Sequence, residues 1–167
     1  MAQWTNSDGL VIQLGITEAA LGKGGSYEDF NRGSLVTEFV VNFGDVPALG
    51  SVVALDQNVV LPSGYVLNEI EIMAETAVTS GGAATIDFGL QRLDRVTELD
   101  YNGIVAALAI TSLNAAGKRV VIQNGSTGAG ALFNGAATSF PGVFTINWNV
   151  AALTAGKIRI KLAAYRV

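Results

Sequence analysis

Hydrophobic and polar residues alternate with a period of two along much of this chain, most clearly near its C-terminus. Successive side chains of a β-strand point to opposite faces, so this pattern predicts strands with one face in a core and the other in water. In one such segment the predicted core positions are Phe144, Ile146, Trp148 and Val150. In the last segment the predicted core positions are Ile158, Ile160, Leu162 and Ala164, separated by Lys157, Arg159 and Lys161 and preceded by a turn at Ala155-Gly156.

Residues 35–43 carry apolar side chains on both faces of the expected strand, which predicts a strand in the interior of a sheet, ending at Gly44-Asp45. Two short strands are expected at 52–55 and 59–61. The sequence Pro62-Ser63-Gly64 then predicts a turn, because proline fixes its own φ angle and glycine accepts a positive one.

A long strand is predicted from residue 65 to about 78, followed by a turn at Thr79-Ser80-Gly81-Gly82 and a strand over 84–91. The pattern favours a hairpin between these two strands. On the polar face of the first strand lie Glu69, Glu71 and Glu75, for which Arg92 is the expected partner across the hairpin.

The remaining middle of the chain is less regular. Residues 93–103 are interpreted as a charged connection, and the Ala-rich residues 104–113 as a short helix that ends by Gly117. A strand at 119–123, a Gly-rich loop at 125–130 and a short strand at 131–133 complete the pattern. Eight or nine short strands with at most one short helix predict an all-β fold, an antiparallel β-sandwich or jelly roll.

The first 33 residues are too polar and Gly-rich to pack on their own, so we interpret residues 1–33 as an extended arm and 34–167 as the sandwich domain. Isolated aromatic residues have no local core here, and the expected contacts with a neighbouring subunit are Trp4, Tyr27 and Phe30, joined by Arg32. A mobile surface loop is the alternative interpretation of this segment.

Composition narrows the possible functions. The absence of His and Cys excludes Ser-His-Asp and Cys-His catalysis, disulfides, and zinc sites built from thiolates or imidazoles. Only 14% of residues are charged, too few to coat a lone soluble domain, which predicts an oligomer or a component of an assembly. The net charge of -4 has the wrong sign for neutralising phosphates, so no nucleic-acid partner is expected.

Two further features concern membranes. Residues 120–156 carry no charge, but their Asn, Pro and Gly content would strand polar groups in a bilayer, so we expect soluble β structure and no membrane partner. The N-terminus shows neither a basic nor an apolar signal region, and synthesis in a cytoplasm is expected.

Candidate chemistry is sparse. Gly22-Lys23 departs from a phosphate-binding loop at Thr17 and Gly24, where that motif needs Gly and Ser or Thr. The three glutamates could form a glycosidase pair, but a solvated strand face explains them without any chemistry and is the favoured interpretation. Oxygen ligands for calcium could come from Asp94, Glu98, Asp100 and Asn102, against the simpler interpretation of a solvated loop. We predict no catalytic residue, no cofactor and no enzyme activity.

Tryptophans can form a sugar-stacking platform, and the chain has Trp4 and Trp148. Because Trp148 alternates in phase with Ile146 and Val150, a core position is the favoured interpretation.

The order of these features resembles the small virion structural proteins of tailed bacteriophages. The similar segments are Trp4-x-Asn6-Ser7-Asp8-Gly9-Leu10, Leu14-Gly15-Ile16-Thr17-Glu18-Ala19, Gly22-Lys23-Gly24-Gly25-x-Tyr27, Leu61-Pro62-Ser63-Gly64, residues 76–82, residues 84–90 and Leu153-Thr154-Ala155-Gly156-Lys157. The resemblance implies a capsid decoration (cement) protein of the virion, a homotrimer near three-fold positions that bridges neighbouring major capsid proteins. A carbohydrate- or receptor-binding module of a virion or tail is the alternative.

Overall fold

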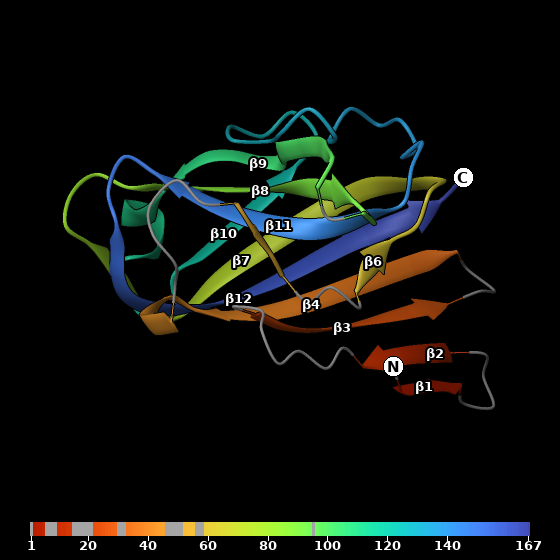
Figure 1. The fold of residues 1–167 in the computed structure, drawn as a ribbon, viewed down its shortest axis with the longest axis horizontal. Helices are drawn as coiled ribbons and strands as arrows, with labels where there is room; N and C mark the ends of the chain where they lie inside the picture. The colour runs from red at the N-terminus through yellow and green to blue at the C-terminus, as the bar shows by residue number, and fades with distance from the viewer. Residues whose placement is uncertain are drawn as a thin grey trace.

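The computed structural model describes residues 2–5, 10–14, 22–29, 33–45, 52–55, 59–94 and 96–167, with the backbone alone for 2–5, 10–14, 22–24, 28–29 and 45. Two antiparallel β-sheets pack face to face (Figure 1). The strands of the larger sheet are, in spatial order, β1 (Ala2–Thr5), β2 (Leu10–Leu14), β3 (Gly22–Asp29), β4 (Ser34–Asn42), β12 (Leu153–Arg166), β7 (Tyr65–Ser80) and β10 (Arg119–Gln123). The smaller sheet contains β5 (Val53–Ala54), β11 (Gly142–Asn149), β8 (Thr85–Arg92) and β9 (Glu98–Ala109), and β6 (Val60–Leu61) also pairs with β11. The predicted all-β sandwich is confirmed.

The core lies between the sheets and is built from the apolar positions of the alternating strands. On β12 these are Ile158, Ile160 and Leu162, each at most 1% exposed. Aromatic rings join the layers, because Phe39 of β4 meets Phe144 of β11 with ring centroids 5.0 Å apart. The pattern at 157–164 therefore predicted the buried face of this strand correctly, and β4 is an interior strand as expected.

The strands at 65–78 and 84–91 do not form the predicted hairpin. Strand β7 pairs with β12 and β10, whereas β8 pairs with β11 and β9 in the other sheet. The Thr79-Ser80-Gly81-Gly82 connection crosses between the layers, so the apolar faces of β7 and β8 meet across the core. Alternation assigns faces equally well to a hairpin and to such an arch, which is why the pattern alone was misleading.

The predicted helix at 104–113 is also wrong. This segment is the second half of β9 followed by a short 3-10 turn, η2 (Ile110–Leu113). Ile104 and Val105 are buried, and Val105 lies opposite Phe88 of β8. Burial of these β-branched residues against a neighbouring strand outweighs the helix preference of the alanines. The second 3-10 turn, η1 (Phe43–Asp45), ends β4.

Twelve strands are present in the described chain, against the eight or nine expected. Four of them were not expected as strands: β1, β2 and β3 within the segment interpreted as an arm, and β9. Residues 131–133 form a turn instead of a strand. Among the described residues, no helix has the length and hydropathy that a membrane span requires.

Two details near the C-terminus differ from expectation. Ala155-Gly156 is an irregularity inside β12, where the register with β7 shifts, and not a turn before it. Val150 is not a core residue, since it is 73% exposed just after β11 ends.

Strand β9 carries a bulge that lies directly on Gly89 of β8. A Cβ atom at Gly89 would come 2.0 Å from the carbonyl oxygen of Asp100 and 2.3 Å from the carbonyl carbon of Tyr101. The register records the same bulge, because Phe88 pairs with Val105 while Leu90 pairs with Asp100. Only glycine allows the two backbones to approach this closely.

We expect Gly89→Ala to lower the free energy of unfolding by at least about 2 kcal/mol, because the new methyl group must displace backbone atoms. Urea denaturation followed by fluorescence measures this. Gly81→Ala is the matched control, since no atom lies within 4 Å of a Cβ built there, and it should stay within about 0.5 kcal/mol of the parent protein. Equal effects of the two substitutions would contradict the assignment.

Candidate functional site

Charged side chains gather on the outer face of the larger sheet, where β4, β12 and β7 run side by side. Lys157, Arg159 and Lys161 come from β12, and the register places Lys161 opposite both Glu38 of β4 and Glu71 of β7. Cross-strand neighbours of opposite charge stabilise such a face. The predicted outward face of the last strand is confirmed.

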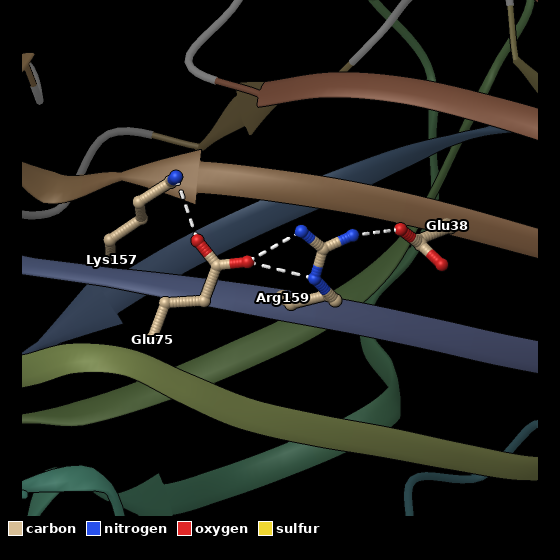
Figure 2. Close-up of polar contacts among 4 residues, drawn as sticks. All are labelled: Glu38, Glu75, Lys157 and Arg159. Carbon is tan, nitrogen blue, oxygen red and sulfur yellow. Dashed lines mark hydrogen bonds and ion pairs between the residues drawn. The ribbon is translucent and has the colours of Figure 1, made fainter. Parts of the chain in front are cut away.

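Arg159 is the centre of this face (Figure 2). Its Nε and Nη2 atoms lie 2.8 Å and 2.6 Å from Oε1 of Glu75, and its Nη1 contacts Glu38 on the other side. Lys157 Nζ lies 2.7 Å from the second oxygen of Glu75. Hydrogen bonds from Lys157 and then Arg159 lower the pKa of Glu75, and the hydrogen bond to Glu75 raises the pKa of Arg159. The network joins three strands across the surface.

The other two glutamates of β7 also have partners on neighbouring strands. Glu69 accepts a hydrogen bond of 2.6 Å from Nε2 of Gln123, and Glu71 lies 3.5 Å from Arg119. The partner proposed from the sequence, Arg92, belongs to β8 in the other sheet, because β7 and β8 do not form a hairpin. All three carboxylates therefore link strands, and the solvated strand face explains them better than a glycosidase pair.

The acidic loop considered for calcium is organised by Asp94. Its Oδ1 accepts hydrogen bonds from the backbone N–H groups of Val96 and Thr97, both 2.9 Å, and its Oδ2 accepts one of 2.6 Å from the Thr97 hydroxyl. The hydrogen bonds from Thr97 are the main reason that the pKa of Asp94 falls to about 2. Across the described ranges, no three acidic side chains are grouped as a metal site requires.

The four residues proposed for partner binding fall in the first strands or between them. Trp4 lies on β1 opposite Ile12 of β2, and Ile12 lies opposite Tyr27 of β3. The side chain of Tyr27 is 40% exposed. Phe30 and Arg32 lie outside the described residues. The register thus places Trp4 and Tyr27 in the same cross-strand row of the sheet, on either side of Ile12.

Trp148 cannot serve as an exposed stacking platform. It is fully buried, and its ring meets Phe43 edge to face at a centroid distance of 6.5 Å. The core position that alternation favoured for this residue is confirmed. Among the described residues, its indole Nε1 has no hydrogen-bond partner.

One end of the sandwich, where β11 begins, presents apolar surface that the sequence analysis did not identify. An open depression of about 410 Å³ lies between the sheet and the 134–140 loop, and its apolar walls are Leu90, Leu99, Leu132 and Phe140. The guanidinium of Arg92 stacks on Phe140 at 4.3 Å from the ring centroid, which leaves that ring 47% exposed. No sequence motif marks this feature, because its residues come from four separate segments.

The opposite end of β11 carries an exposed apolar tip. Val150 has a φ angle of 75°, in the left-handed region that β-branched residues avoid. The turn is closed by a 2.9 Å hydrogen bond from the Ala151 N–H to the Asn149 carbonyl. The sequence pattern placed Val150 in the core because its apolar character continues the alternation of β11.

We expect Glu75→Gln to lower stability near neutral pH and to have little effect in acid. The folded state lowers the pKa of Glu75 below its ordinary 4.5, so its contribution is complete above that value and disappears as the pH falls through the folded-state pKa. Denaturation midpoints of the two proteins should differ most near about pH 7 and converge as the pH falls below the ordinary pKa of 4.5. Salt at about 1 M should narrow the difference, because the pair is exposed. A difference that is independent of pH would contradict this role.

No known family model matches the chain, and no curated protein is similar to it in sequence. Solved structures are similar in fold. A chain in the capsid of Ralstonia phage GP4 matches with a TM-score of 0.51 and 17% identity, over 93% of this chain and 91% of that one. A chain in the acid-stable capsid of the Helicobacter pylori bacteriophage KHP30 matches with a TM-score of 0.50 and 14% identity, over 79% of this chain and 86% of that one. The two-sheet fold described above is therefore one that phage capsid structures contain.

Proposed function

We propose that this chain is a non-enzymatic structural protein of a bacteriophage virion, which decorates the capsid and stabilises it by bridging neighbouring major capsid proteins. The observation that carries the proposal is the likeness in fold to a chain of a phage capsid, which extends over 93% of this chain and 91% of that one. A match of nearly the whole of both chains concerns the complete domain rather than one shared motif.

The surface supports a role in an assembly. Some of its few charges pair with one another on the larger sheet, as in the network of Glu38, Glu75, Lys157 and Arg159. Large apolar side chains are exposed at several places instead, namely Tyr27, Leu93, Val96, Val121, Phe140, Val150, Tyr165 and Val167. Contact with other subunits removes such surface from water, which is favourable only in the assembled shell.

Stabilisation of a shell does not need one strong contact. A shell presents many copies of the same surface, so several weak contacts add through multivalency. We propose a homotrimer seated near three-fold positions, with the major capsid protein as partner. Trp4, Tyr27, Phe30 and Arg32 are the proposed contacts, and the register of β1, β2 and β3 supports a common role for the first two.

The direct test adds the purified chain to shells of its own phage from which the chain has been removed. Co-sedimentation should saturate at a fixed number of copies per shell, and the temperature at which the shell breaks should rise. Absence of co-sedimentation at about 10 μM protein would contradict the proposal, because such shell proteins must bind at least this tightly.

We expect Tyr27→Ser to weaken shell binding at least about tenfold, the effect of losing one well-packed aromatic contact. A point substitution is more informative than removal of residues 1–33, because β3 pairs with β4 along eight positions and its loss would expose the edge of β4. Tyr165→Ser is the matched control, since Tyr165 is 43% exposed on β12 of the same sheet but outside the first strands. The affinity of Tyr165→Ser for shells should change less than about twofold. Equal losses of affinity in the two variants would refute the special role of β3.

A further inference from the structure

The exposed tip at Val150 is held in a conformation that its own side chain disfavours. Glycine or asparagine adopts a φ of 75° at little cost, whereas valine at this angle is strained. The turn is also tied to the connection between the sheets, because the Gly81 N–H donates to the Ala152 carbonyl at 3.3 Å and the Thr79 and Thr154 hydroxyls are 2.8 Å apart. The valine side chain is 73% exposed and lies outside the core that the described residues form.

The depression at the other end of the sandwich has apolar walls, which suit an apolar side chain such as valine. Its volume of about 410 Å³ would hold roughly a dozen water molecules against the side chains of Leu90, Leu99, Leu132 and Phe140. Water in contact with leucine and phenylalanine side chains is readily displaced by an apolar group. None of the lining residues is charged, and the guanidinium of Arg92, which lies against the wall, is stacked on the Phe140 ring.

The two features cannot meet within one molecule. Phe140 lies just before β11 and Val150 just after it, so the eight residues of the strand, about 26 Å in length, separate them. Figure 1 shows the connections before and after β11 at opposite ends of the sandwich. A tip at one end and a depression at the other give a head-to-tail contact between identical copies, which closes into a ring when the rotation between copies permits.

We propose that copies of this chain associate head to tail, with Val150 of one copy seated in the depression lined by Leu90, Leu99, Leu132 and Phe140 of the next. The inference rests on the proposed function as a shell protein, because it describes how the proposed trimer forms. The occupant is a second copy because both halves of the contact are on this chain and the surrounding segment from 120 to 156 carries no charge that would repel an identical neighbour.

Three substitutions test the contact in the purified protein without any shell. Val150→Asn removes the apolar tip, and its melting temperature should equal or exceed that of the parent because asparagine tolerates this φ. Ala137→Arg fills the depression from an exposed residue of its wall. Thr127→Arg places the same charge on an exposed residue that does not line the depression. Sedimentation equilibrium should show association of the parent protein and of the Thr127→Arg control. In Val150→Asn and Ala137→Arg the association constant should be at least about tenfold lower.

Mixing the two defective variants distinguishes a head-to-tail contact from a symmetric one. Each variant keeps the half that the other lacks, so an equimolar mixture should form dimers through one intact contact and nothing larger. A mixture that stays monomeric while the parent associates would overturn the proposal. So would a parent protein that is monomeric at about 1 mM, or variants that associate as the parent does. A monomer that still binds shells would refute this contact and the proposed homotrimer but leave the proposed role in shell binding intact, because shell binding is measured separately.

Discussion

The insertion of β12 between β4 and β7 is the interaction on which the rest of the structure depends. Along its inner face Ile158, Ile160 and Leu162 are buried, and along its outer face Arg159 joins Glu38 to Glu75. The two faces do different work: burial supplies most of the free energy, whereas exposed ion pairs contribute little stability but help fix the register. Without this strand, β7 and β10 would separate from β4 and from the three strands that extend the sheet beyond it.

How far the sequence predicts this fold can be judged from particular elements. The alternation at 157–164 and 144–148 identified the buried face of both strands, because burial of one face is the reason for alternation. Strand partners were not predictable in the same way: a turn at 79–82 is compatible with a hairpin or an arch, and only the pairing of β12 with β7 decides between them. The pattern accordingly identified Glu75 as an outward residue. It did not predict that Lys157 and Arg159 are the ion-pair partners of Glu75.

The surface features were harder still to predict. Val150 continues the apolar rhythm of β11, and nothing in its identity reveals a φ of 75°. The depression at the other end brings together residues 90, 99, 132 and 140, whose proximity follows from the bulge of β9 and the path of the 134–140 loop. The alternation of apolar and polar residues indicates which face of a strand is buried. It indicates neither the φ angle of a turn residue nor which distant segments meet at the surface.

The position of β12 has a consequence for the order of events during synthesis. Strand β12 is made after every other strand described here. Its residue Arg159 nevertheless pairs with Glu38 of β4, 121 residues earlier in the chain. Until β12 leaves the ribosome, β4 and β7 each present an open edge where their common neighbour belongs, and open edges invite pairing with other chains. The sandwich can therefore form only once β12 has been made, through contacts of high sequence separation that make folding slow. A cell that produces many copies at once therefore contains chains that still lack β12. In these chains the place between β4 and β7 is open to an extended segment of another chain.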